Sequence, residues 1–548
     1  MRWCAKGYMD SRLEGGLEKR CHTLCDSSLL IILHWLAKNN KLANIADISQ
    51  AFLRGELLTD PVWLQIPEAI QGMGFDSKFI KLRRCIYGLA DAPLQWQKSL
   101  FKSLRVAGWR QDNQDPCLWY FPKQKPAQEQ KPANGAEAPP AAETESNLVA
   151  SSDEERRNQN PLMSSSIDDP LLQEAQIEGI LGVHVDDTLY GGSRAAHESL
   201  EKVFEEFPPG SRTCLQPGDF DNFCGRTITC TGHGELAPSD KDDDTFSKAE
   251  GGKIFAASSS STYIGFEVGQ QSFIQGMKMI SDAELQNFFQ NRKRKSPLRR
   301  AIGELMWVTK CQVSFVASIC ILAGRVDDEA TEEDYELLVS EVNELIALVK
   351  ENAQDTIKIL PTSSSPDVVL GLVDASLVPR LGAMVCLLNK RKEAAQAGEN
   401  EKDLVYNLVT HYSAKPSRVF SSSTSAELLA IRLIISELLY FRGICVSAGL
   451  ATAVQPLVIC TDSNNVVRSS TNTLIRAPTE RNLRADYFFI SRLVQDGDLC
   501  IFHIKGAANP SDILTKEIAK CDLEMVRRFL QHNDADFQLP PEVLGMLE

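Results

Sequence analysis

The stretch GILGVHVDDTLYGG, residues 179–192, places a pair of aspartates between two apolar runs. This pattern predicts a β-hairpin whose strands reverse at Asp186 and Asp187. Adjacent carboxylates at the end of a buried sheet repel each other and lose hydration, and a bound divalent cation offsets both effects. Carboxylate oxygens are ligands suited to Mg²⁺. The hairpin is therefore a candidate metal site. An ordinary polar turn is the alternative, since Asp-Asp also occurs at 327–328 in charged surroundings.

Further acids outside the hairpin lie in or beside apolar runs. Upstream, Asp47 lies near the end of the short run NIADI, and Phe52 lies five residues after it. Downstream, four more acids come from separate stretches: Asp374 in GLVDAS, Glu427 in SSSTSAELLAI, Asp462 in LVICTDS and Asp512 in NPSDILTKEI. If these four converge, they form a candidate second two-metal site. Taken singly, each is better explained as a surface acid or a helix cap, and TSAE also fits a capping box.

The length and composition indicate a globular protein of several units. The chain has 548 residues, of which 43% are hydrophobic and 24% charged, whereas a single domain usually has about 150 residues. Its net charge of -15 is unfavourable for binding nucleic acid. However, residues 122–178 hold 11 acids and 5 bases, and residues 231–260 hold 6 acids and 3 bases. The remaining sequence is therefore much closer to neutral.

These two acidic stretches divide the chain. Residues 122–178 are rich in Pro, Ala, Glu and Ser and are predicted to be a disordered insertion. Residues 231–260 have the same character and form a second candidate insertion. Three folded stretches remain, at about 1–121, 179–350 and 366–535. No apolar run reaches the roughly 18 residues that a membrane span requires, and no secretory core follows the N-terminus.

Periodicity predicts mixed α/β structure in these stretches. Helices are expected at 27–39, 300–310, 332–352 and 425–442. Strands are expected at 44–48, 62–66, 368–376, 456–463 and 499–506. The run 115–120 should lie beside the first strand of the hairpin, because only the insertion separates them in sequence.

Five segments in order carry a resemblance to a known family. They are DISQAFLRGEL (47–57), VWLQIPEAI (62–70), KLRRCIYGLADAPLQW (81–96), DPCLWY (115–120) and VHVDD (183–187). Together they resemble successive motifs of the reverse transcriptase in copia-type LTR retrotransposon Pol polyproteins. The resemblance implies a right-hand polymerase palm with N-terminally truncated fingers and thumb- or connection-like helices. A ribonuclease H-like α/β domain with a mixed sheet should follow at 366–535.

The resemblance also implies roles for individual residues. Asp47, Asp186 and Asp187 match the polymerase carboxylates, which hold two Mg²⁺ ions, with Mn²⁺ as a substitute. Phe52 matches the aromatic side chain that excludes a ribose 2′-hydroxyl. Tyr87 and Gly88 fall in the segment that lines the dNTP pocket. Without the family, core packing is the preferred interpretation of Phe52 and Tyr87. In the ribonuclease H-like domain the matching metal ligands are Asp374, Glu427, Asp462 and Asp512.

The sequence departs from the family pattern at two positions. His184 stands where a tyrosine is usual, beside the primer end, and Asp91 places an acid where template phosphates are expected. The segment 223–228 resembles the primer grip, and 263–268 is a rival match. The basic run 291–300 is either a backbone grip for the primer–template or a solvated face.

The expected function is RNA-directed DNA polymerase with ribonuclease H activity. Its partners would be an RNA template, a DNA primer, the RNA–DNA hybrid and dNTPs, in cytoplasmic virus-like particles and in the nucleus. The alternatives are an inactive retroelement relic that at most binds nucleic acid, and a chain that retains only ribonuclease H activity. Only 46 residues precede Asp47, so weak polymerisation and measurable hybrid cleavage are expected. The sequence does not indicate the oligomeric state.

Overall fold

The computed structural model describes residues 4–66, 77–123, 176–234, 262–292, 295–377, 380–392, 404–416, 418, 420, 422–471, 483–517, 523–532 and 537–547. Over these residues the chain is a mixed α/β protein with three larger sheets and one two-stranded sheet. Most of the predicted insertions, at 124–175 and 235–261, lies outside the described residues.

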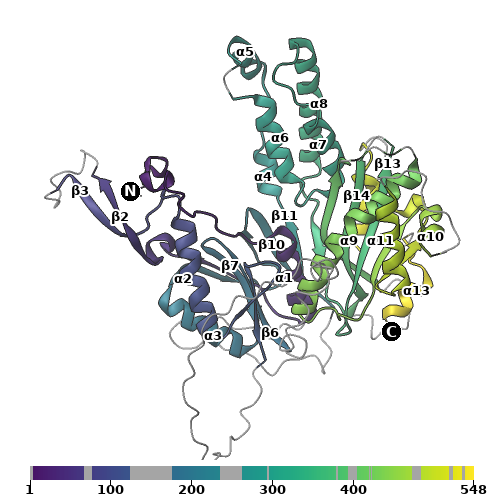
Figure 1. Cartoon of the computed structure of the whole chain (residues 1–548), viewed down its shortest axis with the longest axis horizontal. Coiled ribbons are helices and arrows are strands. Elements are labelled where there is room, and N and C mark those ends of the chain that lie inside the picture. Colours follow the sequence, from purple (N-terminus) through teal and green to yellow (C-terminus); the bar gives the residue numbers. More distant parts are fainter. Residues whose placement is uncertain are drawn as a thin grey trace, which may run out of the picture.

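The first sheet contains the predicted hairpin. Its six antiparallel strands are, in spatial order, β4 (Arg110–Gln111), β5 (Leu118–Pro122), β6 (Ile177–His184), β7 (Asp187–Gly192), β1 (Asn44–Ile48) and β8 (Pro209–Cys214). Helices α2 (Ala92–Val106) and α3 (Arg194–Glu206) pack together and against this sheet (Figure 1). β5 pairs with β6, which confirms the prediction that the run 115–120 lies beside the first strand of the hairpin. β5 continues to Pro122 and β6 begins at Ile177, so the insertion is slightly shorter at both ends than the predicted 122–178.

A two-stranded sheet projects from the first sheet near the N-terminus, formed by β2 (Leu57–Gln65) and β3 (Phe79–Arg84). The second sheet has the order β12 (Ile357–Ile359), β11 (Tyr263–Gly269), β10 (Arg226–His233) and β9 (Phe220–Phe223). β10 thus includes 231–233, which the sequence placed in an insertion. A helical arm rises from this sheet (Figure 1) and has its own hydrophobic core. Its helices are α4 (Gln271–Gly276), α5 (Asp282–Gln290), α6 (Pro297–Val308), α7 (Val316–Ala323) and α8 (Glu332–Glu351).

The third sheet is mixed. Its order is β15 (Leu404–Ala414), β14 (Arg380–Lys390), β13 (Val368–Ser376), β16 (Leu457–Thr461) and β17 (Leu499–His503). β13, β16 and β17 are parallel, whereas β14 and β15 are antiparallel to their neighbours. The associated helices are α9 (Ser423–Ser447), α10 (Asn464–Thr471), α11 (Arg484–Gln495), α12 (Leu523–Leu530) and α13 (Pro541–Leu544). Buried side chains continue to Leu547, beyond the boundary expected at 535.

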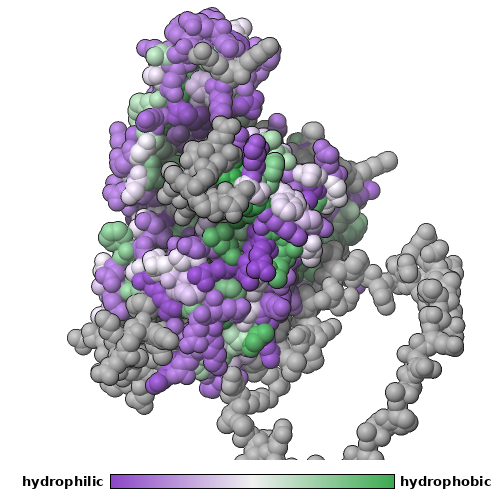
Figure 2. Space-filling model, turned by 90° about the vertical axis from the view of Figure 1, so that its left-hand side faces the viewer, coloured by the Kyte–Doolittle hydropathy of each residue, from purple (hydrophilic) through white to green (hydrophobic). Residues whose placement is uncertain are grey.

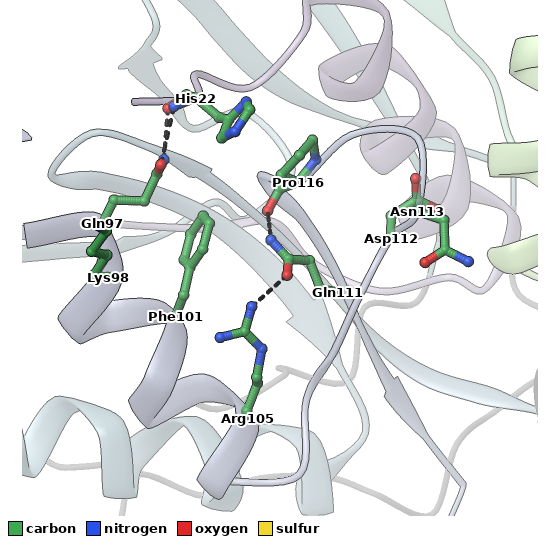
Figure 3. Close-up of a pocket in the computed structure, with 9 residues that line it drawn as sticks. All are labelled: His22, Gln97, Lys98, Phe101, Arg105, Gln111, Asp112, Asn113 and Pro116. Atoms are coloured by element: carbon green, nitrogen blue, oxygen red, sulfur yellow. Dashed lines mark hydrogen bonds between the residues drawn. The ribbon is translucent and has the colours of Figure 1, made fainter. Parts of the chain in front are cut away.

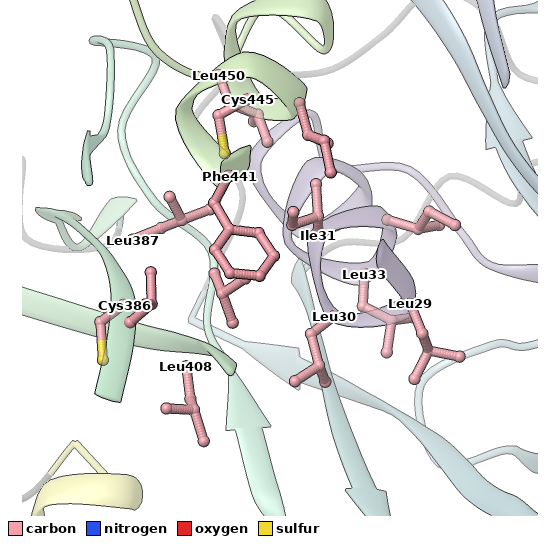
Figure 4. Close-up of a cluster of buried hydrophobic side chains, with 14 of the residues drawn as sticks. Leu29, Leu30, Ile31, Leu33, Cys386, Leu387, Leu408, Phe441, Cys445 and Leu450 are labelled. Carbon is pink, nitrogen blue, oxygen red and sulfur yellow. The ribbon is translucent and has the colours of Figure 1, made fainter. Parts of the chain in front are cut away.

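Helix α1 (Asp26–Lys38) joins the three sheets. Every residue from Ser27 to Lys38 is buried, as expected of a helix that is apolar on most sides. α1 contacts β6 of the first sheet, β11 of the second and β15 of the third. Figure 4 shows Ile31 on the side of α1 that faces Phe441 and Cys445 of α9. Each such fully buried aliphatic side chain contributes about 1.5–3 kcal/mol. The cores of the first and third sheets are consequently continuous.

Figure 2 shows the side from which β2 and β3 project, where hydrophilic residues predominate over the helical arm. Among the described helices, none combines the length and apolar character needed to cross a bilayer.

Candidate functional site

Three predicted acids meet at the end of the first sheet. Asp47 of β1 lies directly opposite Asp187 of β7 in the antiparallel register, and Asp186 precedes Asp187 in the turn. One carboxylate oxygen from each of the three lies within 4.8 Å of the others. We call Asp47, Asp186 and Asp187 the first cluster.

The hairpin turn differs in detail from the prediction. β6 ends at His184 and β7 begins at Asp187, so the reversing residues are Val185 and Asp186 rather than the two aspartates. Val185 adopts a φ of 60°, which is unfavourable for a β-branched residue. Its carbonyl accepts a hydrogen bond of 2.7 Å from Trp96 Nε1, and the Asp186 carbonyl accepts one of 2.9 Å from the Ile48 amide. These bonds hold the backbone of the turn in place beside β1, which carries Asp47.

The electrostatics of the first cluster favour a cation. Burial, followed by the charges of Asp186 and Asp47, raises the pKa of Asp187 to about 6. A divalent cation between the three carboxylates would remove this repulsion, and an all-oxygen donor set fits Mg²⁺ or Mn²⁺.

A cavity of about 640 Å³ opens beside the first cluster, with Asp47 and Asp186 in its wall. Tyr87 lines it, together with apolar side chains of β2 and β3 such as Leu64 and Ile80. Phe52 is not among the lining residues. It is half-buried behind Tyr87, with ring centroids 5.0 Å apart in an edge-to-face arrangement.

Gly88, by contrast, has a structural explanation. Its φ is +94°, and a Cβ at this position would lie 2.1 Å from the carbonyl oxygen of Ala5. The Ala5 amide donates to the Tyr87 carbonyl at 2.7 Å. Gly88 therefore allows the N-terminal segment to pack directly on the chain beside Tyr87.

The expectation that Asp91 faces template phosphates is wrong. Asp91 is buried, and both its oxygens accept hydrogen bonds from Arg12, at 3.0 and 3.1 Å. Arg12 also binds Asp10. The charge of Asp91 is thus neutralised inside the protein.

The segment 223–228 lies beside the first cluster. It forms the β9–β10 turn, and the Phe223 ring lies 6.4 Å from His184, the residue before Val185. Burial and the Arg226 charge lower the pKa of His184, so a neutral imidazole occupies the place expected for tyrosine. The rival segment 263–268 lies within β11, further into the second sheet.

In the basic run at 291–300, the three arginines that the structure describes bind protein groups. Arg299 and Arg300 form ion pairs with Asp328, Glu284 and Glu304. Arg292 donates to the carbonyls of Asp328 and Ala330. Residues 293–294 lie outside the described part of the chain. The described arginines therefore stabilise the helical arm.

A second cluster forms at the end of the third sheet. Asp374 lies near the end of β13, and Asp462 directly follows β16, its parallel neighbour. Parallel strands bring their carboxyl ends to one edge, where ligand sites commonly occur. Glu427 reaches the same place from α9, and one oxygen from each of the three acids lies within 4.8 Å of the others. We call Asp374, Glu427 and Asp462 the second cluster.

Glu427 is held by hydrogen bonds to both adjacent strands. Its Oε1 accepts from the Ala375 amide at 3.2 Å, and its Oε2 accepts from the Thr461 hydroxyl at 3.3 Å. The capping-box alternative is wrong, because α9 is capped by Ser422, whose side chain accepts from the Ser425 amide. Glu427 therefore lies beyond the first turn and points into the sheet.

The second cluster is more buried than the first, and the pKa of each of its three acids is raised. Burial, followed by the charges of Asp374 and Asp462, raises the pKa of Glu427 to about 8. Burial and the charge of Asp512 raise the pKa of Asp374 to about 7. The pKa of Asp462 is also raised, chiefly by burial. Three such acids fit a divalent cation by the same reasoning as the first cluster.

Asp512 lies near the second cluster but outside its 4.8 Å group. It lies in the 3₁₀ helix Pro510–Leu514, where Lys516 Nζ donates to its Oδ2 at 2.5 Å. Thr515 donates a short hydrogen bond to Asp374 Oδ2. The run SDILTK pointed to Asp512 alone, and the contacts of Thr515 and Lys516 were not predicted from it. His503, at the end of β17, pairs with Thr461 at the same sheet edge.

A separate cavity of about 450 Å³ lies beside α2, away from both clusters (Figure 3). Its polar walls are internally hydrogen-bonded: Gln97 pairs with the His22 backbone, and Gln111 accepts from Arg105 and donates to the Pro116 carbonyl. None of the predicted site residues lines it.

Comparison with known proteins identifies a relative by sequence. No family model matches the chain. A segment of 94 residues is 27% identical to the retrovirus-related Pol polyprotein from transposon TNT 1-94 of Nicotiana tabacum. The chain resembles a retrotransposon Pol polyprotein. The match covers 17% of this chain and 7% of the relative's length. It confirms the resemblance to a Pol polyprotein that the motifs indicated.

Similar solved structures include a ribonuclease H and a viral protease-reverse transcriptase. LC11-RNase H1, isolated from compost by a metagenomic approach, is 18% identical, with a TM-score of 0.19, over 27% of this chain and 91% of that chain. A foamy viral protease-reverse transcriptase in complex with double-stranded DNA is 11% identical, with a TM-score of 0.17, over 87% of this chain and 60% of that chain. TM-scores of this size do not establish a shared fold.

Proposed function

We propose that the chain is part of a copia-type retrotransposon Pol protein and combines RNA-directed DNA polymerase with ribonuclease H activity. One observation carries the proposal: six of the seven acids that the motifs single out form two separate three-carboxylate clusters, on two different sheets. Unrelated surface acids would not be expected to assemble twice in this way. Each cluster is of the kind that two-metal phosphoryl transfer requires.

We assign the polymerase to the first and second sheets. The first sheet, together with α2 and α3, would be the palm. Strands β2 and β3 would be part of the fingers, and the helical arm would be the thumb-like connection. The proposal is supported by the hairpin that carries Asp186 and by the cavity beside it. We place the dNTP in this cavity, with Tyr87 in its wall and Phe52 behind Tyr87.

We assign the ribonuclease H-like domain to the third sheet. Support comes from the strand order, with three parallel strands beside two antiparallel ones. It also comes from the position of Asp374 and Asp462 at the carboxyl ends of adjacent parallel strands. The RNA–DNA hybrid would be the substrate there.

The chemistry follows from the donor sets. Mg²⁺ bound at such clusters supplies charge that activates an attacking oxygen and stabilises the leaving group. The residues that would hold it are Asp47, Asp186 and Asp187 in the polymerase, and Asp374, Glu427 and Asp462 in the nuclease. In the nuclease, the Ala375 amide and the Thr461 hydroxyl fix the orientation of Glu427, so that its carboxylate is positioned before a cation binds.

The purified chain tests this proposal on two substrates. The first is a homopolymer RNA template with a DNA oligonucleotide primer and dNTPs, and the second is a labelled RNA–DNA hybrid. We expect Mg²⁺-dependent hybrid cleavage and weak, non-processive incorporation, both abolished by chelator. If the folded chain shows neither activity with Mg²⁺ or Mn²⁺, the proposal is wrong. Hybrid cleavage without any nucleotide incorporation would show that the chain retains only the nuclease activity.

A further inference from the structure

The segment that follows β17 is fixed against the second cluster by its own contacts. Asn509 is fully buried and donates to the Val373 carbonyl at 2.9 Å. Thr515, also buried, donates to Asp374. At Gly382 of β14, an added Cβ would lie 2.8 Å from Leu514 Cβ, so the strand and the segment are in direct contact. The backbone around Lys516 is therefore positioned independently of the charges on its side chain.

Lys516 places an ammonium group among the candidate acids. Its Nζ donates to Asp512 Oδ2 at 2.5 Å, and the two side chains are 38% and 25% exposed. Asp512 and Lys516 both act electrostatically on Asp374 and Asp462. Even so, Asp512 is absent from the group of acids whose oxygens lie within 4.8 Å of one another.

We propose that Lys516 is a positioning residue that opposes cation binding: its ammonium draws Asp512 away from the second cluster and partly neutralises the cluster's negative charge. Lys516 would thus set the cation concentration at which the nuclease site fills. The inference rests on the proposed function, because it assumes that the second cluster binds a divalent cation. A fixed positive charge beside a partly buried cation site lowers affinity strongly, since solvent screens it less than at an open surface.

Calorimetric titration with Mg²⁺, and with Mn²⁺ as a second probe, tests this without measuring activity. All variants carry Asp186→Asn, so that the second cluster is the remaining candidate site. Cation binding that is lost when Glu427→Gln is added is binding at the second cluster. Lys516→Gln should bind the cation about tenfold more tightly. Lys516→Arg, which keeps the charge, should stay within about twofold of the parent, as should Lys390→Gln, which removes an exposed charge at the far end of β14.

The outcomes separate the inference from the proposed function. If the Asp186→Asn parent binds no cation, the nuclease proposal fails and the inference fails with it. If the parent binds and Lys516→Gln binds equally or more weakly, only the inference is wrong, and Lys516 merely caps Asp512. Should circular dichroism show that Lys516→Gln does not fold, Lys516→Met provides the same loss of charge with an apolar chain of similar length.

Discussion

Nε2 of His34 in α1 lies 2.9 Å from Oδ2 of Asp367, which is 333 residues later and immediately precedes β13. Asn407 exchanges hydrogen bonds with the Leu360 backbone, which fixes its amide orientation, and its Nδ2 donates to His34 Nδ1. The proton of a neutral His34 is therefore on Nε2 and donated to Asp367. Lys38 Nζ binds the other Asp367 oxygen at 2.9 Å.

This buried network connects the first sheet to the third. Burial alone would raise the pKa of Asp367, but its electrostatic interactions and hydrogen bonds with His34 and Lys38 outweigh burial and lower the pKa. A buried charge with several partners is tolerated, whereas removing one partner leaves the others uncompensated. We infer that α1 holds the two sheets as one cooperative unit.

The first prediction concerns the stability of this unit. Asp367→Asn should lower the free energy of unfolding by about 3–5 kcal/mol, because Lys38 would remain buried without its counter-ion. Urea unfolding followed by fluorescence and circular dichroism measures the change. The control, Asp60→Asn, alters an exposed acid of β2 and should change stability by about 0.5 kcal/mol or less. A cost below about 1 kcal/mol for Asp367→Asn would show that the network is not essential.

The second prediction is that the two clusters act separately. Asp186→Asn should abolish nucleotide incorporation and leave hybrid cleavage within about threefold, because the second cluster lies on another sheet. Glu427→Gln should have the reverse effect. Primer extension and hybrid cleavage, assayed on the same preparations, provide the comparison. If either variant folds but loses both activities, the prediction that the two sites act independently is wrong.

Elements with local periodicity were predictable from the sequence. The hairpin, α1, α8 and the strands β13 and β16 follow from apolar alternation or helical spacing, and the structure confirms them. The pairing of Asp47 with Asp187 was reached only through the family resemblance. Nothing in composition or spacing indicates that β1 lies between β7 and β8.

Long-range contacts could not be predicted. The family resemblance placed Asp91 beside the template, and its true partner, Arg12, is 79 residues away with no local pattern that links the two. The shared role of α1 was missed for the same reason, since its apolar surface indicates burial without indicating which sheets cover it. Lys516 was overlooked although it is four residues from Asp512, because the run SDILTK does not reveal whether the lysine faces solvent or the acid.

The third prediction links pH to stability through Glu427. Its pKa of about 8 in the folded protein exceeds the value of about 4.3 in an unfolded chain. The folded state therefore holds the extra proton, and its stability should fall as pH rises from about 4 to about 8. Mg²⁺ binds the ionised acids and should raise the melting temperature more at pH 8.5 than at pH 6.

Glu427→Gln provides the control for this pH dependence. The variant should show a shallower loss of metal-free stability between these pH values, and less stabilisation by Mg²⁺, because the titrating group is gone. Differential scanning calorimetry at several pH values, with and without Mg²⁺, measures both effects. An unchanged slope would mean that Glu427 is not the group responsible.

The fourth prediction concerns the insertion between β5 and β6. Pro122 and Ile177 are paired across the two strands, so a linker of about four Gly and Ser residues can replace 124–175. Loop-closure entropy changes slowly with length, and the melting temperature should stay within about 2 °C or rise slightly. Thermal unfolding of the shortened chain checks this. A loss of several degrees would indicate that the replaced segment packs against the first sheet.

The fifth prediction tests sugar selection at the cavity beside the first cluster. Phe52 supports Tyr87 from behind and does not line the cavity, so Phe52→Val should let the Tyr87 ring retreat and make room for a ribose 2′-hydroxyl. The preference for dNTP over rNTP should fall by roughly tenfold to a hundredfold, measured as the ratio of incorporation efficiencies. Phe101→Val removes a similar volume from a buried site beside Trp119. It should lower stability and leave the ratio unchanged, and an unchanged ratio in Phe52→Val as well would assign Phe52 to core packing alone.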